Sequence, residues 1–263
     1  MVHFYDSIPE SLQKWALEQP LFFTATAPLH GRHINLSPKG LTSATFHIFD
    51  GNHVAYIDTA GSGVETISHI YENGRVTIMF CSIDSKPRIM RLFCTGTVVE
   101  RNDVRFAKLL DDMGKTPVAG TRAVILLQVR EAQTSCGYGV PVVEDIDTHV
   151  KHLETSPGGA CSCFSDRPTL EKALKQMEKK NSLDDYILKM NTRSLDGLLG
   201  LREARQMNGE FLSLGDAMAV VDRRLNHPGA LLAGILLGVI LTILVGRLET
   251  ALDVLPRKAY MLS

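Results

Sequence analysis

The residues best suited to chemistry lie in a short glycine-containing stretch between a predicted strand and a predicted helix. Residues 59–66 read Thr-Ala-Gly-Ser-Gly-Val-Glu-Thr and follow a β-type run that ends at Asp58. The first N–H groups of a helix have no acceptor within the helix, and the helix dipole adds partial positive charge there. The side chains of Thr59, Ser62 and Thr66 place hydroxyl donors beside those groups. The stretch therefore predicts a site for an anion such as phosphate.

The same stretch also has a purely structural interpretation. Ser62 and Glu65 have the spacing of a capping box, in which the two side chains satisfy free N–H groups at the start of a helix. Turns with glycine and serine are common between strands and helices. The sequence here matches neither a Walker loop nor the glycine fingerprint of dinucleotide-binding folds. The choice between the two interpretations depends on the residues that surround the stretch.

Composition narrows the class of protein. The chain has 263 residues, 44% of them hydrophobic, and a formal net charge of −1, which allows one large domain with a further segment. A net charge this close to zero argues against nucleic acid as a partner, and we predict none. The five cysteines are an odd number, and the first residues have neither the basic nor the apolar region of a signal peptide. We therefore expect a reducing, cytoplasmic environment.

Short β-type runs and a few helices must position the stretch. The hairpin signal Asp50-Gly51 precedes it, and Asn73-Gly74 ends the helix that follows it. Strands are predicted at 21–26, 33–37, 44–49, 53–58, 76–81, 88–100 and 122–133, and helices at 64–72, 103–113, 169–180, 183–190 and 211–225, after a first short helix that opens at Ser7-x-x-Glu10 and ends at Pro20. This many short strands predict closure into a barrel, because closure removes exposed edges. After residue 141 the sequence is more charged and less regular.

One segment near the end is uniformly apolar. No charged residue occurs from Leu225 to Gly246, and Arg223, Arg224 and Arg247 flank the segment. Residues 228–246 would form a helix of about 28 Å, close to the hydrocarbon thickness of a bilayer. The alternative is a buried core helix, which over this length rarely lacks a polar stripe. We predict a transmembrane helix, in a single-pass, tail-anchor-like membrane protein whose remaining part faces the cytoplasm.

Several longer motifs occur together in this chain. They are Phe-Thr-Ala-Thr-Ala-Pro at 23–28, His-Ile-Asn-Leu-Ser-Pro-Lys-Gly at 33–40, Val-Ala-Tyr-Ile-Asp at 54–58 continuing into 59–66, Glu-Asn-Gly-Arg-Val-Thr-Ile-Met-Phe at 72–80, Pro-Arg-Ile-Met-Arg-Leu at 87–92, Ser-Cys-Gly-Tyr-Gly-Val-Pro at 135–141 and Ser-Leu-Asp-Gly-Leu at 194–198. In combination they resemble the pyridoxamine 5′-phosphate oxidase-like, flavin-binding split-barrel family, and most closely its branch common in fungi. The resemblance covers residues 7–141 well and 142–200 loosely.

The resemblance implies the fold of the first part of the chain, and the sequence pattern supplies the rest of the organisation, because the resemblance does not account for the segment after residue 228. The expected class is mainly β (α+β), an FMN-binding split β-barrel with flanking helices, followed by a C-terminal helical region and one transmembrane helix. Residues 1–141 would form the flavin-binding domain, 142–227 a charged, partly helical extension, 228–247 the transmembrane helix and 248–263 a short tail. Family members are usually homodimers that bind FMN in a cleft at the dimer interface.

The resemblance also implies which residues hold FMN. In the oxidase itself a basic pair holds the flavin phosphate, but Gly63 and Val64 stand at those positions here. Lys39 is then expected to supply the charge, since the family places a basic residue on that strand. The full expected set of cofactor-binding residues is Ser37, Lys39, Thr59, Ser62, Thr66, Arg88 and Arg91. Because side chains alternate along a strand, Arg88 and Arg91 lie on opposite faces and only one of them can serve.

Two of these residues have structural alternatives. Lys39 is equally consistent with an exposed turn lysine, and Arg91 with an ion pair to Glu100 or to a carboxylate at an interface. The sequence assigns no catalytic residue. It also predicts no metal site, because the pairs His30/His33 and His149/His152 have no further ligand placed by sequence. Cys161 and Cys163 could be a reactive or metal-binding pair or simply exposed thiols.

The function implied by the resemblance is that of an FMN-dependent oxidoreductase acting on an unidentified small molecule, which the predicted transmembrane helix would tether to a membrane. The resemblance does not extend to oxidation of pyridoxamine phosphate itself, because the basic and histidine-containing C-terminal segment that recognises that substrate is not found in residues 142–263. Two alternatives remain open. One is a flavin- or haem-binding module without turnover, and the other is a membrane adaptor with a degenerate barrel.

Overall fold

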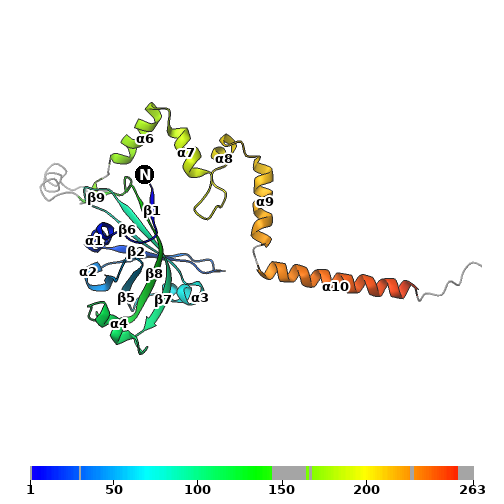
Figure 1. The fold of residues 1–263 in the computed structure, drawn as a ribbon, viewed down its shortest axis with the longest axis horizontal. Helices are drawn as coiled ribbons and strands as arrows, with labels where there is room; N and C mark the ends of the chain where they lie inside the picture. The colour runs from blue at the N-terminus through cyan, green and yellow to red at the C-terminus, as the bar shows by residue number, and fades with distance from the viewer. Residues whose placement is uncertain (1, 30, 144–163, 166–167, 226–227, 254–263) are drawn as a thin grey trace, which may run out of the picture. The chain divides into compact units, whose positions relative to one another are not determined.

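The computed structural model describes residues 2–29, 31–143, 164–165, 168–225 and 228–253. The chain divides into two compact units, Met1–Lys172 and Ala173–Ser263. The first contains a large β-sheet, and the described part of the second is helical (Figure 1).

The first unit is built on one antiparallel sheet. Its strands are β1 (His3–Tyr5), β2 (Phe22–Thr26), β3 (Asn35–Lys39), β4 (Phe46–Ile48), β5 (His53–Thr59), β6 (Arg75–Cys81), β7 (Ile89–Glu100) and β8 (Thr121–Ser135). Seven of them follow the order β3-β2-β6-β7-β8-β5-β4, and β1 pairs with β8. The long strands β7 and β8 form the middle of the sheet, and β5 and β1 pair with successive parts of β8.

The sheet curves around an aromatic core. The ring centroids of Phe22 on β2 and Phe46 on β4 are 4.9 Å apart, and those of Phe46 and Phe80 on β6 are 5.3 Å apart. Strands from distant positions in the sheet order therefore face one another across the same cluster. Among the described strands, β3 and β4 at the two ends of the order do not pair with each other. The sheet is a half-barrel, consistent with the predicted split barrel, rather than a fully closed one.

Helices cover the sheet and explain its apolar runs. They are α1 (Glu10–Glu18), α2 (Thr42–Thr45), α3 (Glu65–Asn73) and α4 (Phe106–Asp112). On β5, Val54 and Tyr56 face the aromatic core, whereas Ala55 and Ile57 face a second cluster that includes Leu110 of α4. Both faces of β5 are thus buried, which is why its sequence is continuously apolar before Asp58.

Most predicted elements are present, with one correction and several additions. The strand predicted at 44–49 is wrong in its first part, because Thr42–Thr45 form one turn of helix and only Phe46–Ile48 form the strand. Gly74 ends α3 with a φ of 69°, the left-handed conformation that the Asn-Gly signal predicted. The elements β1 and α2 and the six-residue helix α8 (Arg202–Met207) are too short to leave a periodic pattern in the sequence.

The second unit consists of short helices and one long helix. After α6 (Thr169–Lys179), which crosses the boundary between the units, come α7 (Leu183–Asn191), α8, α9 (Leu212–Leu225) and α10 (Pro228–Asp253). The two-residue strands β9 (Val142–Val143) and β10 (Phe164–Ser165) pair with each other within the first unit. Among the described side chains of the second unit, only Ala204 and Arg205 are buried.

The transmembrane prediction concerns α10. Over the residues that the structure describes, no helix is long and apolar enough to cross a membrane. The structure therefore does not support the transmembrane helix predicted at 228–246, although these residues do lie within the single helix α10.

Candidate functional site

A polar pocket of about 430 Å³ lies where β3, β5 and the start of α3 come together. Its lining residues are Asn35, Ser37, Pro38, Lys39, Asp58, Thr59, Ala60, Gly61, Ser62, Gly63, Glu65, Thr66 and Arg122. Five of the seven residues predicted to bind a cofactor are among them, namely Ser37, Lys39, Thr59, Ser62 and Thr66. The fold thus brings the strand that ends at Lys39 and the glycine-containing stretch to the same place.

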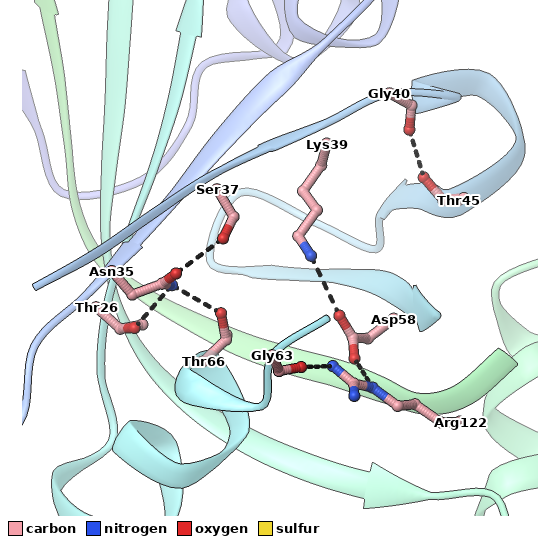
Figure 2. Close-up of polar contacts among 10 residues, drawn as sticks. All are labelled: Thr26, Asn35, Ser37, Lys39, Gly40, Thr45, Asp58, Gly63, Thr66 and Arg122. Carbon is pink, nitrogen blue, oxygen red and sulfur yellow. Dashed lines mark hydrogen bonds and ion pairs between the residues drawn. The ribbon is translucent and has the colours of Figure 1, made fainter. Parts of the chain in front are cut away.

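An ion cluster forms one wall of the pocket (Figure 2). The Lys39 Nζ lies 3.3 Å from Oδ1 of Asp58, and the Arg122 Nε donates to Oδ2 of Asp58 at 2.6 Å. The Asp58 side chain is only 1% exposed, whereas those of Lys39 and Arg122 are 27% and 29% exposed. One buried carboxylate is therefore balanced by two cations that remain partly open to solvent. Lys39 is not the isolated turn lysine of the structural alternative.

Arg122 reaches Asp58 because β8 is irregular at this position. Asp58 pairs with Ala123 and Thr59 pairs with Thr121, so Arg122 is the extra residue of a β-bulge. A bulge leaves one residue out of the ladder and redirects its side chain. The Arg122 Nη2 then also donates to the Gly63 carbonyl at 3.0 Å (Figure 2). Sequence reasoning missed Arg122, because neither the register of β8 against β5 nor the bulge is visible in the sequence.

A hydrogen-bond network organises the hydroxyl groups behind the pocket. The Asn35 Nδ2 donates to the hydroxyl oxygens of Thr66 at 2.9 Å and Thr26 at 3.2 Å, and the Ser37 hydroxyl donates to the Asn35 Oδ1 at 2.8 Å. Thr26 is also 2.9 Å from the Nδ1 of the buried His69. Since Thr66 accepts from Asn35, its own proton is available for another acceptor. The sequence did not identify Asn35 as the centre of this network.

The pocket contains two carboxylates as well as two cations. Asp58 is held in the ion cluster, whereas Glu65 is exposed at the first position of α3. Deeper on the same face of β5, burial raises the pKa of the Tyr56 hydroxyl far above its usual value, and the Asp58 charge raises it further. Tyr56 is therefore a neutral hydroxyl at physiological pH, and no negative charge joins that of Asp58 from this side.

The predicted capping box at Ser62 and Glu65 is wrong. The helix α3 begins at Glu65, and Val64 occupies the N-cap position without a side-chain hydrogen bond to the helix. Ser62 is two residues before that position, so its hydroxyl is not placed as an N-cap side chain would be. The Glu65 side chain instead turns back over Gly63, where an added Cβ would collide with its Oε2. The first N–H groups of α3 consequently have no capping side chain.

The other two predicted residues lie away from the pocket. The Arg88 guanidinium is 5.3 Å from the ring centroid of Trp15 on α1, whose ring packs against the aromatic core. The Arg91 Nη1 donates to Gln133 at 3.1 Å and to Ser135 at 3.4 Å on the neighbouring β8. The two arginines thus lie on opposite faces of the sheet, as strand alternation predicts.

The suggested partner of Arg91 is engaged elsewhere. Glu100 accepts a hydrogen bond of 2.6 Å from the Tyr71 hydroxyl, at the far end of β7 from Arg91. The structural role of Arg91 is therefore to join β7 to β8 through Gln133 and Ser135.

The structure describes only some of the candidate metal ligands and cysteine thiols. Within the described ranges, no group of three or more His, Cys, Asp or Glu side chains could hold a metal ion. Of the pairs considered from the sequence, His30, His149, His152, Cys161 and Cys163 lie outside the described residues. Cys81, Cys94 and Cys136 are free thiols, and burial raises the pKa of Cys94 to about 12.

Comparison with known proteins identifies the family. A family model described as pyridoxamine 5′-phosphate oxidase matches residues 8–136. The pyridoxamine 5′-phosphate oxidase family protein ustO of Aspergillus flavus is 48% identical over 209 residues, which cover 80% of this chain and 82% of that protein. The chain therefore belongs to the pyridoxamine 5′-phosphate oxidase family, which confirms the resemblance seen in the sequence. Proteins of this family commonly bind flavin.

Solved structures give weaker likenesses. HupZ of Group A Streptococcus is 20% identical with a TM-score of 0.36, covering 46% of this chain and 89% of that one. An F420 reductase is also 20% identical, with a TM-score of 0.34 and coverage of 48% and 98%. Likenesses at this level carry no conclusion about the pocket.

Proposed function

We propose that this protein binds FMN with the phosphate of the cofactor in the pocket between β3, β5 and α3, and that it uses the flavin to oxidise or reduce a small molecule. The observation that carries the proposal is the convergence of Lys39, Arg122 and four hydroxyl side chains on one pocket. Membership of a family that commonly binds flavin supports it.

The residues of the pocket fit a phosphate group. Phosphate oxygens accept hydrogen bonds, and the pocket offers the hydroxyls of Thr59, Ser62 and Thr66 beside the uncapped start of α3. Arginine and lysine are the side chains that most often bind phosphate. A water molecule takes about 30 Å³, so a pocket of about 430 Å³ accommodates a phosphate together with part of the chain attached to it.

The flavin and the protein would have different roles in the reaction. A bound flavin would supply the electron-transfer chemistry, and the protein supplies binding and orientation. Lys39 supplies positive charge at the pocket wall, and the Thr66 proton is free for a ligand oxygen. Asp58 fixes the directions of the two cations, and its own buried carboxylate is neutralised by them.

Binding can be tested on the full-length protein by titration with FMN, followed by absorbance and flavin fluorescence. We expect a one-to-one complex and, for Lys39→Met, a dissociation constant about tenfold higher, because one charge-assisted contact is lost. Lys108→Met is the matched control, since Lys108 is an exposed lysine paired with Asp112 on α4. A wild-type protein that neither contains nor takes up FMN would overturn the proposal.

Turnover separates the enzyme from a flavin-binding module. If the protein is an oxidoreductase, the FMN complex consumes NAD(P)H or another reductant in the presence of an acceptor, at a rate above that of free FMN. An FMN complex without such consumption would contradict the catalytic part of the proposal and favour the binding module.

We also propose that the chain forms a homodimer. Large apolar side chains are exposed on the segments beside the pocket: Ile34 is 79% exposed, Leu36 64%, Leu41 67% and Val64 51%. Covering them against a second copy removes apolar surface from water. Light scattering of the wild-type protein should give the mass of a dimer, and Leu36→Glu should lower it. A monomeric wild-type protein would contradict this proposal.

Finally, we propose membrane association through residues 228–246, with the sheet on the cytoplasmic side. The support is the absence of charge in this segment and the exposure of its large apolar side chains, since the ten from Leu232 to Val245 are each 51–64% exposed. The full-length protein should float with liposomes, and the variant with Leu236→Glu and Leu241→Glu should not. Wild-type protein that stays in the dense fraction would count against the proposal.

A further inference from the structure

We propose that Arg122 takes the place of the basic pair missing at positions 63 and 64, and that it makes the pocket selective for the phosphate-bearing flavin over riboflavin. The inference rests on the proposed FMN site, but it concerns a residue that neither the sequence motifs nor the family resemblance indicates. It follows from the position, the free donors and the fixed orientation of the Arg122 guanidinium.

The Arg122 guanidinium lies beside the turn where the basic pair of the oxidase would stand. Its Nη2 donates to the carbonyl of Gly63, so the guanidinium lies against the very turn in which the pair would stand. A side chain on residue 63 itself would meet the end of the Glu65 side chain, which would have to move aside. The cation that contacts this turn comes from β8 rather than from the turn's own segment (Figure 2).

The guanidinium keeps donors for a ligand. An arginine side chain has five N–H donors. The contacts from Nε to Asp58 and from Nη2 to Gly63 leave further N–H groups on the same guanidinium. Arg122 lines the pocket and its side chain is 29% exposed, so these groups can meet a phosphate oxygen. Planar, paired donation of this kind is the usual way in which arginine binds phosphate.

The orientation of the Arg122 guanidinium is fixed before any ligand binds. The bulge between Asp58 and Thr59 directs Arg122 inward, and the buried carboxylate of Asp58 holds its Nε at 2.6 Å. A side chain that is already held in place loses little conformational freedom on binding. Asp58 cancels only one of the two positive charges of Lys39 and Arg122, so this wall of the pocket keeps an excess of positive charge.

The test compares three probes on the full-length protein: FMN, riboflavin and inorganic phosphate. Arg122→Met should raise the dissociation constant for FMN by about tenfold or more and weaken phosphate binding, while riboflavin affinity changes less than about twofold. Arg130→Met is the matched control, because Arg130 is the extra residue of the other bulge on β8 and does not line the pocket. It should leave all three affinities unchanged.

A second variant tests the same charge balance without touching the ion cluster. Glu65→Gln removes an exposed negative charge from the pocket and should tighten FMN and phosphate binding by about threefold, again without effect on riboflavin. Because Glu65 is on the surface, this variant remains informative if Arg122→Met fails to fold, which a lowered melting temperature would reveal.

The outcomes separate the inference from the proposed function. If wild-type protein binds phosphate but not FMN, and Arg122→Met loses the phosphate, the FMN proposal fails and only the phosphate-binding role of Arg122 stands. If FMN binds tenfold more tightly than riboflavin and a folded Arg122→Met retains that ratio, or if Glu65→Gln leaves FMN and phosphate binding unchanged, the role of Arg122 is wrong. Wild-type protein that binds neither FMN nor phosphate overturns both.

Discussion

The two units of the chain use ion clusters in opposite ways. In the first unit one buried carboxylate, Asp58, lies between two partly exposed cations that line a pocket. In the second unit the buried group is a cation: the Arg205 side chain is 2% exposed and contacts Glu210 at 3.0 Å and Asp216 at 2.8 Å. The first arrangement leaves cationic donors free for a ligand, whereas the second occupies its central cation with carboxylates of the same unit.

The difference follows from what else stabilises each unit. The first unit has an extended apolar core. Its ion cluster is therefore not needed to hold the unit together, and some of its N–H donors can stay free. In the described part of the second, the only buried apolar residue is Ala204. The ion pairs of Arg205 belong to a larger network, because Glu210 also pairs with Arg193 and Asp216 also pairs with Arg202. This network is therefore the main connection that we identify between α8 and α9.

The largest expected effect is on the core of the first unit. Phe46→Ala should destabilise the sheet by about 3–5 kcal/mol, because it removes a fully buried ring that contacts Phe22 and Phe80. Phe211→Ala in the second unit is the matched control, since Phe211 is 82% exposed, and it should change stability by no more than about 0.5 kcal/mol. Urea unfolding followed by far-ultraviolet circular dichroism, which reports the sheet and the helices alike, measures both. Equal losses would contradict the contrast between the units.

A smaller, local effect is expected from Arg205→Met. The change leaves Glu210 and Asp216 without their shared buried partner, so α8 and α9 should exchange amide hydrogens faster while β5 to β8 keep their protection. Arg202→Met removes only an outer contact of the network, because its side chain is 71% exposed, and should have a weaker effect. Protection lost equally in the sheet would show that the units do not respond separately.

Lowering the pH should change the stability of α8 and α9 gradually. The hydrogen bonds from Arg205 lower the pKa values of Glu210 and Asp216 from their usual 4.5 and 3.8. A carboxyl group whose pKa is lower in the folded state adds stability above its unfolded pKa, and this stability is lost as the pH falls through the folded value. The protection of α8 and α9, measured relative to the intrinsic exchange rate at each pH, should therefore be constant above about pH 5 and fall below about pH 4. Protection that falls on raising the pH instead would contradict this network.

The sequence by itself determined the family, most of the strands and one wall of the pocket. The alternation of apolar residues, the Asp-Gly and Asn-Gly turns and the stretch from Thr59 to Thr66 are local signals, and local signals specify local structure. They were enough to place Ser37 and Lys39 with Ser62, because the family motif links those segments. The prediction of a capping box at Ser62 and Glu65 was wrong because the same spacing fits more than one helix start.

Only the tertiary structure decided what completes the pocket. Arg122 is 64 residues from Asp58 in the chain, and it reaches Asp58 through one extra residue in the pairing of β5 with β8. Adding or removing one residue in a strand changes which face its side chains occupy, and no periodicity in a single segment records that choice. The sequence therefore supplied the hydroxyls that line the pocket and Lys39. The fold supplied the second cation and the carboxylate contacts that hold both cations in place.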